Sequence, residues 1–345
     1  MNPIVMATLV LTMGIGTSIT LMSSHWLFAW IGLEMNTLAF LPIMAHKSHP
    51  RAVEAATKYF LVQAAAASLI LFSGMTNAWL TGSWEIQQMS HPLTTTIFTM
   101  ALALKIGLAP FHFWMPEVLQ GLNLKVGLIL CTWQKIAPIC ILLQLHSFPP
   151  LITALGLISS LVGGWGGLNQ TQLRKLLAYS SIAHLGWLTV VLQFSTPLGL
   201  LSFALYTVMT AAAFLTLSLN NATNISTLAT TWAKAPAIAT ATPPIFLSLG
   251  GLPPFTGFSP KWLILQELTK QSCTPLATLM ALSALLSLFF YLRISYVAAL
   301  TTSPNNLTSA SWRLPQSKLT LPASLCISSC VLLIPVTPTV FSLLP

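Results

Sequence analysis

The chain has 345 residues, of which 55% are hydrophobic and only 6% are charged. A soluble domain has about 25% charged residues, so this composition excludes a soluble enzyme, a nucleic-acid-binding protein and a disordered protein. The class that remains is a polytopic membrane protein. The net charge of +9 comes from 14 Lys and Arg against five acidic residues, all of them Glu. In a membrane protein such an excess usually gathers in the loops of one face, so it indicates orientation.

The apolar runs predict eleven transmembrane helices, since a span needs about 20 residues. Long apolar runs, in place of short alternating strands, exclude a β-barrel. The expected spans are residues 3–22, 25–46, 57–79, 93–121, 124–145, 150–170, 174–194, 197–219, 238–267, 276–299 and 320–343. The first run has no basic region before it and is long enough to cross a bilayer, so it is interpreted as a span and not as a signal peptide. The whole chain is expected to form one transmembrane domain.

The basic residues fall almost entirely on one side of this predicted topology. Lys270 alone lies on the side opposite the N-terminus. The ten on the N-terminal side are Lys47, Arg51, Lys58, Lys125, Arg174, Lys175, Lys234, Arg293, Arg313 and Lys318. Because basic loops stay in the compartment of synthesis, the N-terminus is expected there.

The sequence lacks the motifs of a bound cofactor. It contains no GxGxxG, Walker loop, CxxC or CxxCH. The chain itself is therefore expected to bind no nucleotide, flavin, iron–sulfur cluster, haem or metal. The five cysteines are interpreted as small apolar packing residues.

Four ionisable residues lie inside the predicted spans: Glu34, Lys105, Lys135 and Lys261. Each costs roughly 2.5–3.5 kcal/mol at the middle of a membrane on insertion scales, so a purely structural protein would do better with Leu. The alternatives to a function are a structural ion pair, or a lysine that extends to the membrane surface. The second alternative suits Lys261 best, because the other three lie near the middle of their spans.

The pairing of Glu with Lys suits a switchable proton site. Burial lowers the pKa of a lysine, and a nearby carboxylate raises it again. Lys105 would then hold its proton while Glu34 is close and release it when Glu34 withdraws. Arginine is always charged and could not do this.

Two histidines extend this set, His184 within the span 174–194 and His112 just after Pro110. An imidazole can accept a proton on one nitrogen and release one from the other, which suits a relay. The alternative for each is a core histidine that is hydrogen-bonded to a helix carbonyl.

The pattern GLxPF occurs twice, each time inside an over-long apolar span. Its residues are Gly107 and Pro110 in 93–121, and Gly251, Pro253 and Pro254 in 238–267. Proline breaks a helix and glycine lets the chain turn. Paired interrupted spans at corresponding positions mark the transport site in inverted-repeat transporters. The sequence therefore predicts two inverted five-helix repeats, 1–146 and 150–299, followed by a final helix at 320–343.

These residues resemble those of the antiporter-like subunits of respiratory complex I, in the form that animals, and vertebrates in particular, have in mitochondria. The resemblance covers the whole chain. Its most specific segments are HWLFAWIGLEMNTLAFLPIM, KYFLVQAAAASLIL, LKIGLAPFHFWMPEVLQGL, WQKIAPI, RKLLAYSSIAHLGW and GGLPPFTGFSPKW. It implies that Glu34 and Lys105 are a coupled pair. It also implies that Lys135 is the central relay and that Lys261 is the relay of the second broken helix.

The resemblance also implies a location and partners. Bacterial members have fourteen helices, and this chain is expected to lack the first three, with its N-terminus in the matrix and its C-terminus in the intermembrane space. NADH oxidation and ubiquinone reduction are expected on other subunits, which would hold NAD, FMN, iron–sulfur clusters and ubiquinone. The expected partners are neighbouring antiporter-like subunits, small membrane-arm subunits and phospholipids, and no nucleic acid.

The leading function is therefore proton translocation across the inner mitochondrial membrane, driven by redox chemistry elsewhere in the complex. The proton is expected to pass from Lys105 through Lys135 towards Lys261, with help from water and His184. Two alternatives stay open. One is a stand-alone cation/proton antiporter, for which Glu34 is the only mid-membrane carboxylate. The other is an assembly scaffold without a proton path of its own.

Overall fold

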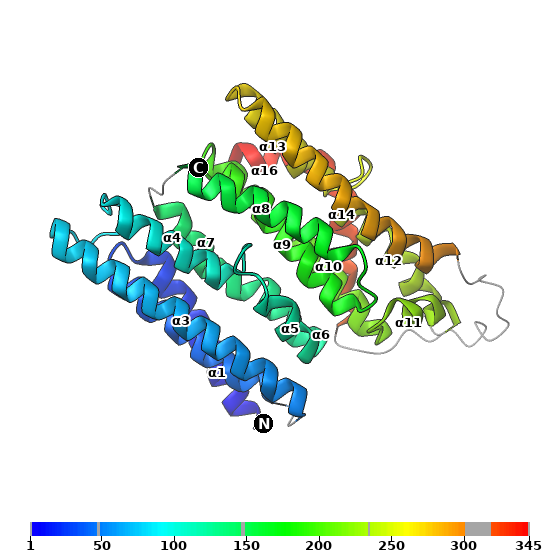
Figure 1. The fold of residues 1–345 in the computed structure, drawn as a ribbon. Coiled ribbons are helices and arrows are strands. Elements are labelled where there is room, and N and C mark those ends of the chain that lie inside the picture. Colours follow the sequence, from blue (N-terminus) through cyan, green and yellow to red (C-terminus); the bar gives the residue numbers. More distant parts are fainter. Residues whose placement is uncertain (1, 47–48, 146–148, 234, 301–318, 344–345) are drawn as a thin grey trace. The chain divides into compact units, whose positions relative to one another are not determined.

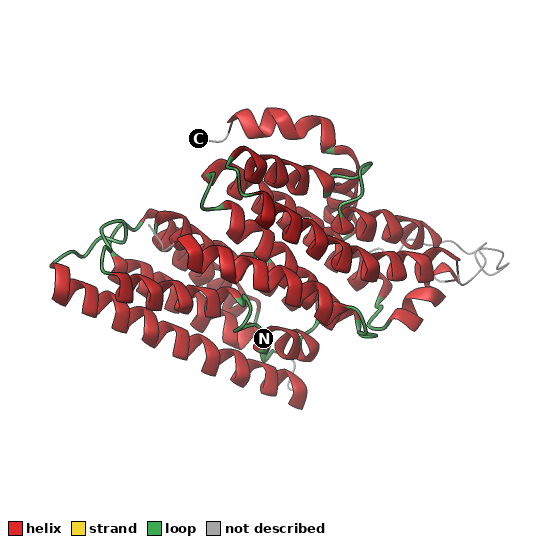
Figure 2. Cartoon of the chain, turned by 45° about the horizontal axis from the view of Figure 1, so that its top comes forward, coloured by secondary structure: helices red, strands yellow, loops and turns green. Residues whose placement is uncertain are grey.

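The computed structural model describes residues 2–46, 49–145, 149–233, 235–300 and 319–343. Within these ranges the chain is helical and contains no strand (Figure 2). The prediction of an all-helical membrane protein is confirmed. Four of the basic residues used for the orientation, Lys47, Lys234, Arg313 and Lys318, lie outside the described residues.

The chain folds as two compact units, Met1–Leu155 and Gly156–Pro345. The helices of the first unit are α1 (Pro3–Met22), α2 (Trp26–Met44), α3 (Pro50–Thr81), α4 (Pro92–Ile106), α5 (Trp114–Gly121), α6 (Leu124–Cys131) and α7 (Trp133–Gln144) (Figure 1). Helix α2 packs between α1 and α3, α3 contacts α4 and α5, and α7 contacts α1, α2 and α4. These contacts give the unit an interior that α2, α3, α4 and α7 share.

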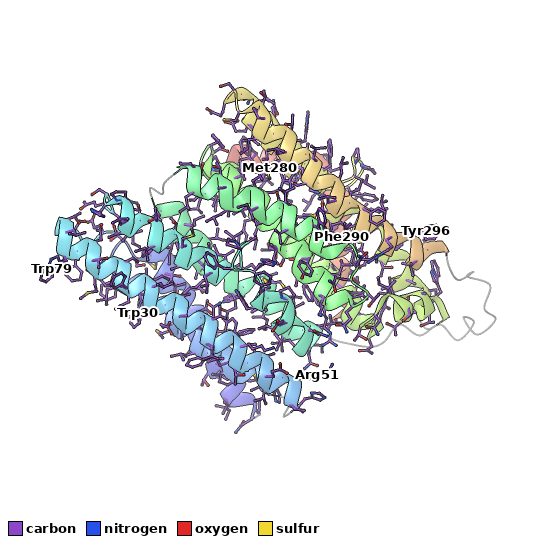
Figure 3. The ribbon with its side chains drawn as sticks, viewed as in Figure 1. Trp30, Arg51, Trp79, Met280, Phe290 and Tyr296 are labelled. Carbon is purple, nitrogen blue, oxygen red and sulfur yellow. The ribbon has the colours of Figure 1, made fainter. Side chains whose placement is uncertain are left out.

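Small residues let α1 and α2 approach closely. A Cβ atom added to Gly32 would lie 2.7 Å from the carbonyl oxygen of Gly16, so the crossing requires glycine. Trp30 of α2 then donates from Nε1 to the carbonyl of Ala67 in α3 at 3.1 Å. At the far end of α3 from Arg51, Trp79 is 90% exposed and points away from the bundle (Figure 3).

The second unit contains most of α8 (Pro149–Gly167) and all of the later helices. These are α9 (Leu173–Val191), α10 (Thr196–Asn220), α11 (Ile225–Ala229), η1 (Thr230–Ala233), α12 (Pro236–Gly250), α13 (Phe258–Lys270), α14 (Thr274–Leu300), α15 (Thr320–Leu332), η3 (Ile334–Val336) and α16 (Thr337–Leu343). Helix α10 contacts α9, α12, α13 and α15, and α12 packs against α14. Helix α8 packs closely against α14 at Phe290, which is labelled in Figure 3. A Cβ atom added to Gly167 of α8 would lie 2.8 Å from the Phe290 ring.

Seven helical segments among the described residues are long and apolar enough to cross a membrane, one of them formed by α6 and α7 together; the number is eight if α15 and α16, which meet at a 71° bend, form one span. Of the eleven expected spans, 93–121 and 238–267 correspond to the shorter helix pairs α4/α5 and α12/α13. The span 174–194 corresponds to α9, which carries Arg174, Lys175 and His184. The count of eleven stays a prediction.

The two interrupted spans leave the helix at glycine. Helix α4 ends at Ile106 and is followed by Gly107 with φ +83°, and α12 ends at Gly250 and is followed by Gly251 with φ +82°. Both helices are 15 residues long and begin with proline. A positive φ costs a residue with a side chain about 1–2 kcal/mol, which explains glycine at both positions.

The structure differs from the predicted boundaries in three main places. The expected final helix 320–343 is bent by 71° between α15 and α16, where the 3-10 turn η3 contains a proline. Helix α3 begins at Pro50, seven residues before the expected start at 57, because His49 caps the Arg51 amide and proline suits a first helical turn. The expected span 124–145 is interrupted at Thr132, where φ is −113° and ψ is −70°. The Thr132 hydroxyl donates to the Leu128 carbonyl at 2.8 Å, and such bonds bend helices.

Candidate functional site

Lys105 and Glu34 form an ion pair inside the first unit. Lys105 lies in the last turn of α4, and its Nζ is 4.0 Å from Oε1 of Glu34 in α2. The lysine side chain is 2% exposed and the glutamate side chain 23%. Within the described part of the chain, Lys105 Nζ has no hydrogen-bond partner. The carboxylate is therefore the nearest compensation for this buried amine, and the pair is held by charge and not by a direct hydrogen bond.

Two local features hold this pair in place. The Thr37 hydroxyl lies 2.9 Å from the Glu34 carbonyl oxygen and 3.4 Å from Oε2 of the same residue. The second of these contacts ties the carboxylate to the next turn of α2. Lys105 lies two residues before Gly107, where the carbonyl end of the α4 dipole favours a cation.

Lys105 and Lys135 line the same cavity. Its lining also includes the amides and hydroxyls of Asn36, Tyr59, Gln63 and Gln134. The cavity volume is ≈ 10 Å³, which is room for about one water molecule. A water held there would lie among polar side chains with which it can hydrogen-bond.

Lys135 lies in the first turn of α7, three residues after the interruption at Thr132. It is 2% exposed, and its backbone amide donates to the Thr132 carbonyl at 3.3 Å. The interruption therefore determines the position of the first turn of α7, and this turn carries Lys135 to the cavity.

Lys261 and His184 meet in the second unit at the end of α12. Lys261 Nζ donates to the carbonyl of Gly250 at 2.8 Å. Nε2 of His184 lies 3.2 Å from the carbonyl oxygen of Leu249. The last carbonyls of a helix have no partner within the helix, so these two side chains satisfy adjacent orphan carbonyls. Lys261 therefore points into the helix break.

His184 also contacts its own helix, since Nδ1 lies 2.7 Å from the Ser180 carbonyl oxygen. A neutral imidazole carries one N–H, so donation to Leu249 and Ser180 at the same time requires the charged form. These carbonyl contacts are the ones expected of a core histidine that is hydrogen-bonded to helix carbonyls. A relay role for His184 stays a prediction.

His112 lies in the non-helical segment between α4 and α5. It is 5% exposed, its ring lies 4.3 Å from that of Phe113, and its carbonyl accepts from the Met115 amide at 3.0 Å. These contacts fix the segment after Pro110. His112 does not line the cavity that Lys105 and Lys135 share.

The cavity contains polar residues that the sequence reasoning did not single out, namely Asn36, Tyr59, Gln63 and Gln134. The signal was present, because Gln63 and Gln134 are amides inside apolar spans. Among the described residues, no group of three or more His, Cys, Asp or Glu could hold a metal ion.

Long apolar helices, two helix breaks and buried amines around a polar cavity define the class: a polytopic membrane protein with an ionisable interior. The chain belongs to the family described as "NADH:quinone oxidoreductase/Mrp antiporter, TM", which matches residues 23–287. Residues 288–341 match the family described as "NADH dehydrogenase subunit 2 C-terminus". The resemblance drawn from the sequence is thereby confirmed.

The chain is similar to proteins named "NADH-ubiquinone oxidoreductase chain 2" from fish. It is 60% identical to that of Salmo salar, covering 100% of this chain and 99% of the relative. It is 59% identical to that of Tetraodon nigroviridis, covering 99% of both. Among solved structures, a chain of respiratory complex I from Thermus thermophilus with bound aureothin is similar with a TM-score of 0.86 and 27% identity. That match covers 98% of this chain and 80% of the other.

Proposed function

We propose that this chain is a core membrane subunit of respiratory complex I that translocates protons across the inner mitochondrial membrane. The energy comes from NADH oxidation and ubiquinone reduction on other subunits. The observation that carries the proposal is the single cavity lined by Lys105 and Lys135, with Glu34 4.0 Å from the first of these amines.

The pair of Glu34 and Lys105 acts as the switch. A signal from neighbouring subunits changes the distance between carboxylate and amine, and the proton of Lys105 moves through the cavity water to Lys135. Moving one charge across the membrane costs about 2.3 kcal/mol per 100 mV. A tenfold change in proton affinity corresponds to about 1.4 kcal/mol, so a change of one to two powers of ten is of the same order as this cost.

The second unit continues the path. Lys261 and His184, at adjacent carbonyls of the α12 terminus, receive the proton after Lys135, and His112 borders the first helix break. The matching lengths of α4 and α12, and the matching backbone at Gly107 and Gly251, support two five-helix repeats followed by a final helix. Eleven spans then place the two ends on opposite sides, with the N-terminus in the matrix and the C-terminus in the intermembrane space.

The partners and cofactors follow from membership of the complex. The neighbours are other antiporter-like subunits, small membrane-arm subunits and phospholipids. NAD, FMN, iron–sulfur clusters and ubiquinone are held by other subunits, so this chain contributes proton transfer and no redox centre.

The replacement Lys105→Met in the assembled enzyme tests this proposal. We expect fewer protons translocated per NADH oxidised, because methionine keeps the volume and cannot carry a proton. The measurement is proton uptake against NADH oxidation in liposomes. Lys270→Met is the matched control, since that lysine side chain is 63% exposed and far from the cavity in the sequence. Undiminished translocation in Lys105→Met would contradict the proposal.

The family match, whose description includes Mrp antiporters, favours stand-alone cation/proton antiport as a second candidate. That function predicts proton movement driven by a Na⁺ gradient in liposomes that contain only this chain. A scaffold without a proton path predicts instead that Lys135→Ala leaves the proton-to-electron ratio unchanged in the assembled complex.

A further inference from the structure

The amide of Gln134 connects four helices of the first unit. Its Nε2 donates to Asn36 Oδ1 of α2 at 3.2 Å and to Met13 Sδ of α1 at 3.6 Å. Its Oε1 accepts from the Tyr59 hydroxyl of α3 at 3.5 Å. Asn36 and Tyr59 are each 2% exposed and Met13 is 3% exposed. The network therefore lies in the interior of the unit.

These contacts use the whole amide. A glutamine offers two N–H donors and one carbonyl acceptor, and here both donors and the acceptor have partners. Tyr59 supplies a donor, whereas the Asn36 oxygen and the Met13 sulfur accept. In this arrangement the Gln134 amide links α7 to α1, α2 and α3 at the same time.

The network lies next to the lysine cavity. Gln134, Asn36 and Tyr59 all line it, and Gln134 directly precedes Lys135. Both residues are in the first turn of α7, just after the interruption at Thr132. In this turn the Lys135 amide donates to the Thr132 carbonyl, and the Gln134 side chain ties the same turn to α1, α2 and α3.

We propose that Gln134 is a positioning residue whose amide, held by Asn36 and Tyr59, fixes the first turn of α7 so that Lys135 faces the cavity it shares with Lys105. The inference rests on the proposed function, because it assigns Gln134 an effect on proton transfer through Lys135. Gln134 carries no proton itself, since an amide does not titrate near neutral pH.

The test is the proton-to-electron ratio of the assembled enzyme in liposomes, measured for Gln134→Leu. Leucine keeps most of the volume and removes all three hydrogen bonds. We expect normal NADH oxidation and a loss of translocated protons that is about half or more of the loss in Lys135→Met, since the amine remains but is displaced. A merely structural role would lower the amount of assembled enzyme and leave this ratio unchanged.

Gln144→Leu is the matched control, because it makes the same change at the other end of α7. The Oε1 atom of Gln144 is buried and has no hydrogen-bond partner among the described residues. Its replacement is expected to leave the ratio at the wild-type value. The double variant Gln134→Leu with Asn36→Leu is expected to lose no more than Gln134→Leu alone, since both changes remove one network.

The outcomes separate this inference from the proposed function. A wild-type ratio in Lys135→Met would overturn the proposed function. A reduced ratio in Lys135→Met together with a wild-type ratio in Gln134→Leu would overturn the positioning role alone. If Gln134→Leu does not assemble, Gln134→Asn decides, because its amide is one methylene too short to reach both Asn36 and Tyr59. A partial loss there supports the role, and a wild-type ratio overturns it.

Discussion

The four ionisable residues within the predicted spans lie in three kinds of environment. Glu34 faces Lys105 at 4.0 Å, Lys135 lines a polar cavity, and Lys261 binds a helix carbonyl at 2.8 Å. A charge at mid-membrane costs roughly 2.5–3.5 kcal/mol without such compensation. The ion pair lacks a direct hydrogen bond, so a small movement of either helix changes the distance between its charges.

Replacing Glu34 by Gln tests the switch at this scale. The substitution keeps the shape and removes the charge that compensates Lys105. We expect the initial rate of proton uptake, at a fixed rate of NADH oxidation, to fall at least about tenfold. This corresponds to a loss of about 1.4 kcal/mol or more of charge interaction. The measurement is the initial rate of proton uptake at fixed NADH oxidation.

Glu54→Gln is the control for this change. Glu54 also pairs with a lysine, at 2.8 Å, but its side chain is 61% exposed. Water and salt screen an exposed pair, so this variant is expected to behave as the wild type. Equal rates in Glu34→Gln and Glu54→Gln would show that the buried pair has no special role.

At the scale of elements, the helix breaks place the functional groups. Gly107 follows the turn that carries Lys105, and Gly251 follows the carbonyls that Lys261 and His184 contact. Backbone without helical hydrogen bonds is tolerated at membrane depth only where protein or a cavity surrounds it. The breaks thus leave backbone carbonyls free to accept hydrogen bonds from side chains. Along an intact helix these carbonyls would bond to backbone amides.

Replacing Gly251 by Ala tests the role of the second break. Gly251 has φ +82°, and an added Cβ would lie 2.9 Å from Lys261 Cδ and 3.0 Å from its Nζ. We expect a destabilisation of about 1–3 kcal/mol, from the left-handed backbone and from displacement of a lysine that is hydrogen-bonded. The measurement is the midpoint of thermal inactivation of the assembled enzyme.

Gly14→Ala makes the same chemical change in α1, where an added Cβ has no atom within 4 Å. Alanine favours a helix over glycine by about 1 kcal/mol, so this control is expected to match or exceed the wild-type midpoint. A Gly251→Ala enzyme as stable as Gly14→Ala would contradict the account of the break.

At the scale of the whole molecule, the sequence predicts those features that depend on residues close together in the chain. Long apolar runs predict the helical membrane fold, and charged residues within them indicate the candidate site. Proline and glycine mark the breaks after Ile106 and Gly250. The interruption at Thr132 has no proline or glycine directly beside it, and the nearest proline is Pro138 in α7.

Contacts between distant segments could not be predicted in the same way. Gln134 reaches Asn36 and Tyr59, and His184 reaches Leu249, only because particular helices pack side by side. An amide or imidazole in an apolar run indicates a need for a partner. It does not indicate which helix supplies that partner, and for this reason the polar network of the cavity was missed.

The most direct measurement of the central claim is the number of protons translocated per NADH by the assembled enzyme with Lys135→Arg. Arginine keeps the positive charge and does not release its proton in proteins. If the buried amines work by exchanging protons, the ratio falls as far as it does in Lys135→Met while NADH oxidation continues. If instead they are static charges that hold the helices together, Lys135→Arg keeps the wild-type ratio, and that result would contradict the account.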